Sequence, residues 1–500
     1  MMRDKYYIIS LVSVMILGLT LIFGCGSGGG GGAPTTTTTS TTAAPTTSTT
    51  AASTTTVAST TSTTAGPTTS TTSTTSTTLP TASEPTFSAA GGTYETNAIL
   101  VTLECATGGA DIYYTTNGST PDTGSIPYTG PISLEVSRTI RAIAVKSGYN
   151  NSTVAAATYD LYWWQPVGSG FGSIVMALEH DGTYLYAGCL NSPYAAKWDG
   201  SDWTSLETGL DNSVSALAML DGDLFAGGSF TGKVTRYVSG AWSTMGSGCN
   251  NAVRVLLGRE GTFPADDCMY LGGDFTSVSG SSVPANHVAK YTLSSPSYWT
   301  SFEAGVDGAA YALCRNGDDV YVAGKFTLAD NSITCNNIAK WNDLYLTWEA
   351  LDGGITSLSD ECIYALAYDG TSNILYAGGF FPLGKSISGM DHVAQYSSGT
   401  WQVMGSGISG PSNPVRAMLI KGSDVYVFGD LYSASGVTVE RMAKWDGSSW
   451  TKPFPQGTDD AGDTIYAAVF GPDGSLYIGG YFSSVGGVSC NSIAKWGRKE

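Results

Sequence analysis

The sequence predicts an all-β protein whose larger part is a seven-bladed β-propeller. Charged residues make up only 13% of the 500 residues, whereas the chain contains 64 Gly, 28 Tyr and 12 Trp. Low charge with abundant Gly and aromatic residues is typical of short strands joined by tight turns. After the first 24 residues, no segment has the sustained apolar period of an amphipathic helix. A pattern that repeats from about residue 161 to the C-terminus indicates the propeller.

The N-terminal residues 1–24 have the pattern of an export signal. Two basic residues precede an apolar run from Tyr6 to Phe23, which is the order of a signal peptide. The run ends Leu21-Ile22-Phe23-Gly24-Cys25, which resembles a bacterial lipobox. The resemblance implies that Cys25 is the lipid attachment site and the first residue of the mature chain. An ordinary signal peptide or a membrane-spanning anchor is the alternative, because the run is close to the shortest length that spans a bilayer.

Residues 25–83 are a linker rich in Gly, Thr, Ser, Ala and Pro. Without large apolar side chains, such a segment cannot offset the entropy lost on ordering, so we expect a disordered, Thr-rich stalk. The stalk would act as a spacer that holds the folded part away from the membrane.

Residues 84–160 predict a small β-sandwich. Apolar runs separated by Gly, Asn and Pro turns indicate short antiparallel strands, at Ile99–Leu103, Ile112–Thr115, Ile132–Val136 and Ile140–Val145. The segments Gly91–Tyr94, Ile112–Pro121, Tyr128–Ile132 and Ala142–Ala144 together resemble the chitobiase/hexosaminidase C-terminal type of domain, also called the GH29D-like β-sandwich. The resemblance implies a fibronectin-III-like accessory module without catalytic residues, which serves as a spacer or binds carbohydrate.

Residues 161–500 contain seven copies of one pattern. Its anchor is an Ala-Lys-aromatic triplet that recurs about every fifty residues. The triplets are Ala196–Trp198, Ala289–Tyr291, Ala339–Trp341, Ala443–Trp445 and Ala494–Trp496, with looser copies at Thr235–Tyr237 and Ala394–Tyr396. An aliphatic-Tyr strand that ends in Gly-Gly precedes the triplet, and a tight turn with a second Trp follows it. Four short strands per copy are the unit of a propeller blade.

The same marks resemble the kelch repeat, which has Gly-Gly after an aliphatic-Tyr strand and a later Trp. They are also similar to the propeller repeats of fungal cortical polarity-marker proteins, which have Gly-Gly-x-Phe and Ala-Lys-Trp elements. The corresponding Phe residues here are Phe230, Phe275, Phe326 and Phe482. Either resemblance implies the propeller fold for the whole of residues 161–500.

The two ends of this region predict how the ring closes. The last copy stops at Trp496 and has no outer strand of its own. Residues 164–170 match residues 401–407, which form an outer strand in another copy. We therefore expect the strand that contains Trp164 to complete the last blade, so that no edge is left unpaired.

The sequence shows no catalytic, cofactor-binding or metal-binding motif. The three histidines, His180, His287 and His392, fall in separate copies, whereas a metal site needs several converging ligands. Asp-rich segments occur at residues 221–223, 318–319 and 459–463. We interpret them as turns rather than calcium sites, because Asp-Gly makes the turn between two strands of a copy.

Eight cysteines remain if Cys25 carries lipid, and an exported protein is free to form disulfides. Cys335 and Cys490 occupy the same place in two different copies, so we do not expect them to pair with each other. Cys189 and Cys314 lie within strand patterns, where a buried thiol is the simplest expectation.

Recognition is expected in the loops between Gly-Gly-x-Phe and the triplet. The recurring Trp and Tyr residues hold fixed strand positions, so we assign them to packing between blades. The loops vary between copies and leave the same end of the second strand, so they gather on one face of the disc. They are Thr276–Asn286, Thr327–Asn337, Pro382–Asp391, Ser433–Glu440 and Ser483–Asn491.

The function that we expect is non-catalytic binding or scaffolding at the bacterial cell surface. The partner would be a protein or a glycan, the membrane would be reached through the lipid on Cys25, and the protein would be a monomer without a cofactor. A net charge of −18 without a basic stripe argues against nucleic acid. The alternative is an extracellular polysaccharide-active enzyme, with candidate carboxylates at Glu207, Glu303, Glu349 and Glu361. A third possibility is a structural role in envelope assembly.

Overall fold

The computed structural model describes residues 78–261, 267–294, 296–355, 362–381, 390–409, 415–458 and 463–500. Every regular element in these ranges is a β-strand, which confirms the all-β class. Within the same ranges, no helix has the length and hydrophobicity needed to cross a membrane. The predicted signal peptide, Cys25 and nearly all of the Thr-rich linker lie outside the described residues.

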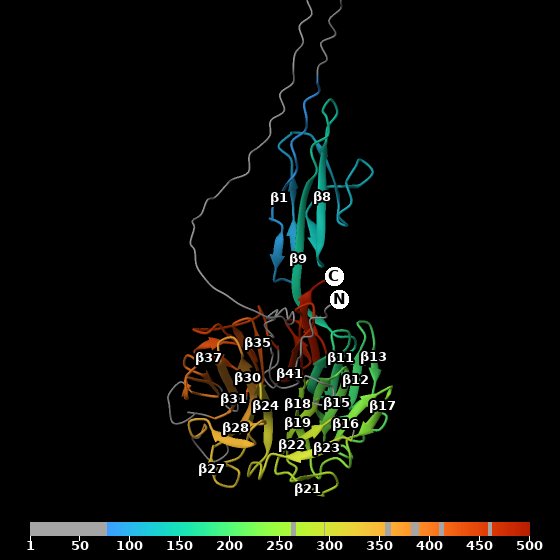
Figure 1. Ribbon diagram of the computed structural model, residues 1–500. Coiled ribbons are helices and arrows are strands. Elements are labelled where there is room, and N and C mark those ends of the chain that lie inside the picture. Colours follow the sequence, from blue (N-terminus) through green and yellow to red (C-terminus); the bar gives the residue numbers. More distant parts are fainter. Residues whose placement is uncertain are drawn as a thin grey trace, which may run out of the picture. The chain divides into compact units, whose positions relative to one another are not determined.

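The first folded part is a β-sandwich (Figure 1, blue to teal). Its strands are β1 (Thr86–Phe87), β2 (Gly92–Tyr94), β3 (Ile99–Val101), β4 (Leu103–Glu104), β5 (Asp111–Thr115), β6 (Ile126–Pro127), β7 (Ile132–Leu134), β8 (Arg138–Val145) and β9 (Ala155–Pro166). β1 pairs with β4 and β3 with β7, whereas β6, β5, β8, β9 and β2 form one continuous sheet in that order. Val101, Ile140 and Tyr159 are fully buried in the core between them.

The strand β9 belongs to two sheets. Its first half pairs with β8, where Tyr159 lies opposite Arg138, and its second half pairs with β45 (Ile493–Arg498), where Trp164 lies opposite Trp496. The expectation that an N-terminal strand completes the last repeat is therefore confirmed. The two residues at the expected domain boundary, 160 and 161, both lie within β9.

The longer strands that follow form six four-stranded antiparallel sheets and, together with β9, a seventh group of four strands. The first sheet contains β10 (Val175–His180), β11 (Leu185–Cys189), β12 (Ala195–Trp198) and β13 (Trp203–Ser205). The second contains β14 (Val214–Leu220), β15 (Asp223–Gly228), β16 (Val234–Val238) and β17 (Ala241–Thr244). The third contains β18 (Val253–Arg259), β19 (Cys268–Gly273), β22 (Val288–Thr292) and β23 (Tyr298–Ser301).

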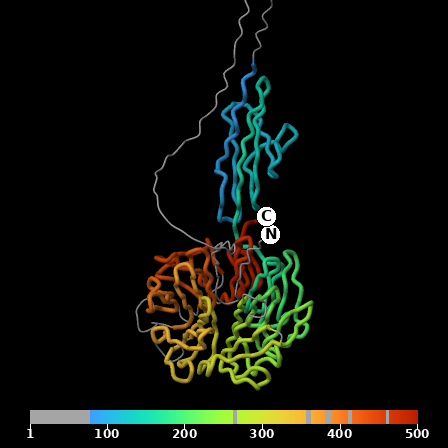
Figure 2. The backbone as a smooth tube through the Cα atoms, in the orientation of Figure 1, coloured from blue at the N-terminus to red at the C-terminus, as the bar shows by residue number. Residues whose placement is uncertain are grey.

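The fourth sheet contains β24 (Ala310–Asn316), β25 (Asp319–Gly324), β28 (Ile338–Asn342) and β29 (Thr347–Ala350). The fifth contains β30 (Cys362–Asp369), β31 (Ile374–Phe380), β32 (Val393–Ser397) and β33 (Thr400–Gln402). The sixth contains β35 (Val415–Lys421), β36 (Asp424–Gly429), β39 (Met442–Trp445) and β40 (Trp450–Thr451). The seventh group is β41 (Thr464–Phe470), β42 (Leu476–Tyr481), β45 and β9. Figure 2 follows the chain from green through yellow to red as it passes from sheet to sheet.

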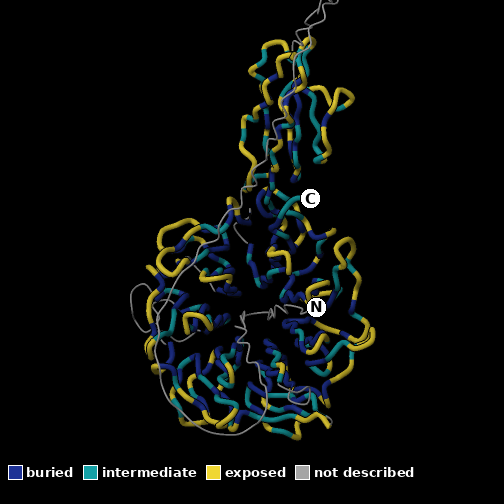
Figure 3. The backbone as a smooth tube through the Cα atoms, turned by 45° about the horizontal axis from the view of Figure 1, so that its top comes forward, coloured by how far each residue is buried: buried dark blue, intermediate teal, exposed yellow. Residues whose placement is uncertain are grey.

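The Gly-Gly motif lets each sheet lie close to its neighbours. A Cβ atom on the first glycine would collide with the next sheet: at Gly227 it would lie 2.6 Å from Cγ1 of Val253. A Cβ on the second glycine would collide within the same sheet: at Gly228 it would lie 2.0 Å from the Ser213 carbonyl oxygen. A larger residue at Gly227 or Gly228 would therefore force these neighbours to move, whereas other repeats accommodate Ala323, Phe428 or Cys189 at the equivalent positions. Many residues of these strands are buried (Figure 3, dark blue).

The outer-strand tryptophans connect adjacent sheets. Trp203, Trp348, Trp401 and Trp450 each donate the indole N–H to a backbone carbonyl of the preceding repeat, at 2.8 to 3.0 Å. Trp164 makes the equivalent bond to the Gln456 carbonyl, at 2.8 Å. Most of these rings are buried, as expected for residues that pack between sheets.

The expected recognition loops contain short hairpins. These are β20 (Ser277–Val278) with β21 (Val283–Pro284), β26 (Leu328–Ala329) with β27 (Ile333–Thr334), β37 (Ser433–Ala434) with β38 (Val437–Thr438), and β43 (Ser484–Val485) with β44 (Val488–Ser489). A further strand, β34 (Ile408–Ser409), pairs with β37. Residues 382–389 of the remaining loop, Pro382–Asp391, lie outside the described residues.

Candidate binding cavity at the axis of the sheets

Each of the seven groups of strands begins with a strand that contains a β-bulge at the same position. In β18, Val253 pairs with Gly273 and Val255 with Gly272, so Arg254 is an extra residue without a partner. The same shift recurs in every first strand. The extra residues are Met176, Ser215, Arg254, Tyr311, Tyr364, Arg416 and Tyr466. A bulge redirects a side chain out of the regular alternation of its strand.

These same seven residues line one cavity of about 290 Å³. Each comes from a different group of strands, so the cavity lies where all seven groups meet. Its volume is at the lower end of the range of small-molecule pockets. The repeated bulge therefore builds a single pocket whose wall takes one side chain from each repeat.

The tyrosines and one arginine of the wall stack on one another. The Tyr311 and Tyr364 rings lie 5.4 Å apart and are nearly parallel. The guanidinium of Arg416 lies 4.2 Å from the Tyr364 ring centre and 5.6 Å from that of Tyr466. Such cation–π contacts hold an arginine in place without neutralising its charge.

The two arginines of the wall differ in their partners. Arg254 donates to Oδ2 of Asp274 from Nε and Nη2, at 2.9 and 2.7 Å, so its charge is compensated. The Nε atom of Arg416 is buried and has no hydrogen-bond partner among the described residues. Among the seven lining residues, Arg416 is therefore the cation without a carboxylate partner in the described structure.

Two phenols of the wall, those of Tyr311 and Tyr364, stay protonated near neutral pH. Burial, reinforced by the charge of Asp274, raises the pKa of Tyr311. Burial and then a hydrogen bond with the Cys362 thiol raise the pKa of Tyr364 to about 12. Protonated phenols, guanidinium groups and the Ser215 hydroxyl make a wall rich in hydrogen-bond donors.

The cavity and the expected recognition loops lie at the same end of the sheets. The bulged residues are near the start of each first strand, and that start pairs with the Gly-Gly end of the second strand, as Val253 does with Gly273. The loops follow the Gly-Gly ends directly. The face on which the expected recognition loops gather is thus also the face nearest to the cavity.

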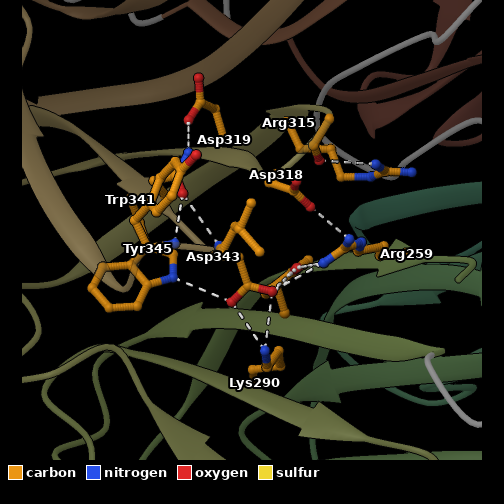
Figure 4. A network of polar contacts seen from close by, with 12 residues as sticks. Arg259, Lys290, Arg315, Asp318, Asp319, Trp341, Asp343 and Tyr345 are labelled. Atoms are coloured by element: carbon orange, nitrogen blue, oxygen red, sulfur yellow. Dashed lines mark hydrogen bonds and ion pairs between the residues drawn. The ribbon is translucent and has the colours of Figure 1, made fainter.

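A second polar cluster lies at the opposite end of β18 and β24 (Figure 4). Asp343, whose side chain is only 4% exposed, accepts hydrogen bonds from Lys290 at 3.0 Å, Arg259 at 3.0 Å and Tyr270 at 2.9 Å. Burial alone would raise the pKa of Asp343, but the bonds from Lys290, Tyr270 and Trp341 outweigh burial and lower it. Because these donors belong to the third and fourth sheets, the cluster joins the two sheets.

The candidate carboxylates for an enzyme do not line the cavity. Glu349 lies on the outer strand β29 and pairs with Lys340 at 2.7 Å. Glu207 and Glu303 follow the outer strands β13 and β23. Glu361 lies outside the described residues.

The histidines lie in different sheets. His180 ends β10, where its Nδ1 accepts a hydrogen bond from the Gly182 N–H at 2.8 Å. His287 and His392 precede β22 and β32 in left-handed backbone conformation, with φ of 66° and 64°. No group of three or more His, Cys, Asp or Glu residues that could hold a metal occurs in the described ranges.

The described Asp-rich segments act as turns and ion-pair partners. Asp221 and Gly222 have φ of 49° and 80° and form the turn between β14 and β15. Asp318 pairs with Arg259 at 2.7 Å, and Asp319 lies 3.7 Å from Lys340. Asp459 and Asp460 lie outside the described residues, whereas Asp463 is buried.

The eight described cysteines are all thiols. Cys189 and Cys314 are completely buried in strands, as expected. Cys335 and Cys490 are also buried thiols and hold equivalent places: each Sγ contacts the carbonyl oxygen at the start of its own loop, at Thr327 and Ser483.

Sequence reasoning did not identify the lining of the cavity. A signal was present: each copy places one residue of variable type between two small or aliphatic residues, as in Val253-Arg254-Val255 and Ile465-Tyr466-Ala467. If side chains simply alternated between the two faces of a strand, that residue would be assigned to one face of its sheet. The bulge that turns it toward the axis appears only when the two strands are paired.

Comparisons with solved structures return matches of low identity. The extracellular domain of a hybrid two-component system from B. thetaiotaomicron is 14% identical, with a TM-score of 0.44, and the match covers 66% of this chain and 39% of that one. A GH74 xyloglucanase from Xanthomonas campestris is 12% identical, with a TM-score of 0.39, and the match covers 64% of this chain and 53% of that one. This chain thus spans about half or less of these two structures. No curated protein matches the sequence.

Family models match two segments. Residues 89–156 match the chitobiase/beta-hexosaminidase C-terminal domain, and residues 471–495 match a beta-propeller domain of unknown function, DUF5122. The first match covers most of the sandwich, and the second covers β42 and most of the last repeat that follows it. The chain therefore combines a domain of the chitobiase/beta-hexosaminidase C-terminal type with a β-propeller.

Proposed function

We propose that this chain is a non-catalytic, monomeric lipoprotein of the bacterial cell envelope that binds a protein or a carbohydrate outside the cytoplasm. The observation that carries the proposal is the cavity lined by Arg416, Tyr364 and five further side chains, one from each first strand. A regular propeller does not require bulges at its axis. Their repetition favours a surface built for a ligand.

The same region is proposed to be a seven-bladed, kelch-like propeller. Seven groups of four strands and seven equivalent bulges support this number. Val175 and Leu178 of the first sheet share a buried cluster with Ala467 and Val469 of the last group, which supports a closed ring.

A binding role is favoured over catalysis by the nature of the wall. The seven lining residues of the described structure include no carboxylate and no histidine. These are the side chains that most often transfer protons in glycoside hydrolysis and related reactions. The wall consists mainly of phenols, guanidinium groups and one aliphatic hydroxyl. These groups can bind a polar ligand through hydrogen bonds.

The remaining parts fit the display of this site at a surface. The lipobox at Cys25 would attach the chain to a membrane, and the Thr-rich linker would extend from it. The fibronectin-III-like sandwich would act as a spacer next to the propeller. Its match to a chitobiase/beta-hexosaminidase C-terminal domain supports a setting in which carbohydrate is present.

Binding by the full chain, purified in detergent, to an array of glycans and envelope proteins tests the proposal. We expect a restricted set of ligands, with binding lost in a Tyr364→Ala, Arg416→Ala variant and kept in Arg138→Ala, whose exposed side chain lies in the sandwich. Equal binding by the cavity variant would contradict the proposed site. Release of reducing sugar from a bound glycan would contradict the non-catalytic role.

Metabolic labelling with palmitate tests the anchor separately. We expect the label in the wild-type chain and in Cys105→Ser, and its complete loss in Cys25→Ser. Label retained in Cys25→Ser would refute the lipobox assignment.

A further inference from the structure

We propose that the cavity binds an acidic saccharide and that Arg416 holds the carboxylate or sulfate group of that sugar. The inference rests on the proposed binding function and specifies its ligand. It depends on three properties of the wall: one cation that has no carboxylate partner among the described residues, several hydroxyl groups, and a central aromatic ring that already stacks on two neighbours.

The uncompensated cation is the first property. Arg416 has a buried Nε without a partner in the described residues, whereas Arg254 in the same ring is neutralised by Asp274. A guanidinium charge without a carboxylate partner is unfavourable next to buried aromatic rings. The planar guanidinium matches the two oxygens of a carboxylate or sulfate. An oxyanion in the cavity would compensate the charge of Arg416, which lines it.

The hydroxyl groups are the second property. The side-chain hydroxyls of Tyr311, Tyr466 and Ser215 form no hydrogen bond with the described residues, so they are available to a ligand. A hydroxyl both donates and accepts, which matches the hydroxyls of a sugar ring. An inorganic anion would leave these groups without partners.

The covered aromatic faces are the third property. Tyr311 stacks on Tyr364, and the guanidinium of Arg416 lies against the faces of Tyr364 and Tyr466. Tyr364, which stacks on both Tyr311 and Arg416, therefore offers little free ring surface to a flat aromatic ligand. A cavity of about 290 Å³ enclosed by seven strands also suits a compact ligand better than an extended peptide, which normally adds to a sheet edge or a groove.

The test is a set of matched probes for the full chain in detergent, measured by titration calorimetry. The probes are oligogalacturonate with its methyl ester, a sulfated carrageenan oligosaccharide with its desulfated form, and an aspartate tripeptide. We expect one acidic saccharide to bind at least tenfold more tightly than its neutral counterpart, and its affinity to fall as salt rises. The two saccharide pairs separate a carboxylate ligand from a sulfate ligand.

Substitutions of Arg416 test whether its side chain causes the preference for the acidic saccharide. Arg416→Met should weaken the acidic saccharide at least tenfold and leave the neutral counterpart unchanged, and Arg416→Lys should restore part of the loss. Arg138→Met makes the same change of charge in the sandwich and should have no effect. The thermal midpoint of each variant verifies that it is folded.

The possible results separate the inference from the proposed function. Equal binding of acidic and neutral saccharides, unaffected by Arg416→Met, would overturn the acidic ligand but keep a carbohydrate-binding cavity. Tighter binding of the aspartate tripeptide than of any saccharide would overturn the saccharide and favour a peptide ligand. Failure of every probe in this set, together with failure of every glycan and envelope protein on the array, would overturn both.

Discussion

Gly479 in the last repeat lies directly against Val175 in the first. A Cβ atom placed on Gly479 would be 2.5 Å from Cγ1 of Val175. The same relationship joins Gly227 to Val253 and Gly378 to Val415 in consecutive repeats. The contact between the last and first repeats is thus of the same kind as the contacts between consecutive repeats, although the two residues are far apart in sequence.

We expect Gly479→Ala to destabilise the protein by about 1–3 kcal/mol, because the added methyl group overpacks the junction between the last and first sheets. The thermal midpoint and the denaturant midpoint measure the change. Gly172→Ala is the control, since a Cβ there meets no atom within 4 Å. Equal stability of the two variants would show that the close contact does not hold the junction.

We expect Trp164→Phe to cost about 1–3 kcal/mol, because the Gln456 carbonyl loses the indole N–H that lies 2.8 Å away. Trp299→Phe is the matched control. The Trp299 indole N–H occupies an outer strand in another repeat and has no partner in the described structure. A smaller loss of unfolding free energy for Trp299→Phe would assign the difference to the hydrogen bond, and equal losses would argue against it.

We expect Asp343→Asn to destabilise the protein by about 3–5 kcal/mol, because Lys290 and Arg259 would keep their charges without the buried carboxylate. Asp424→Asn tests a comparable pair on the surface: Lys444 holds the same triplet position as Lys290, and Asp424 is 28% exposed. That variant should cost less than about 1 kcal/mol. Urea unfolding of both variants decides between these expectations.

We expect stability to fall as the pH drops from 7 toward 5. Burial lowers the pKa of His180 and of His392 below the ordinary value of 6.5, so both are neutral in the folded protein. Below that value the unfolded chain takes up protons that the folded chain does not, and unfolding becomes more favourable. The thermal midpoint measured across this range should therefore decrease.

The variant His180→Asn, His392→Asn tests the cause of that decrease. Asparagine keeps an acceptor close to each imidazole nitrogen, and it tolerates the left-handed backbone at residue 392. Its thermal midpoint should change less between pH 7 and 5, and should differ from wild type by a constant amount above pH 7. A drop as large as that of the wild type would refute the assignment.

The repeat pattern itself specified most of the local structure. Residue types and spacing predicted the all-β class, and they also predicted that the strand containing Trp164 completes the last repeat. Both predictions were possible because turn residues, strand alternation and the Gly-Gly motif act over a few neighbouring positions. Cys189 and Cys314 were likewise assigned as buried thiols from their strand positions, and the structure agrees.

The axial cavity was decided by tertiary structure alone. Arg416 and Tyr364 are residues of separate repeats, and each looks like an ordinary member of an alternating strand. Only the pairing of Val415 with Gly429 and of Ala417 with Phe428 makes Arg416 an extra residue. Only the meeting of all seven first strands places its guanidinium over Tyr364. The sequence determined what each repeat is, because local forces act within a repeat; the site depends on distances between repeats, which no single repeat contains.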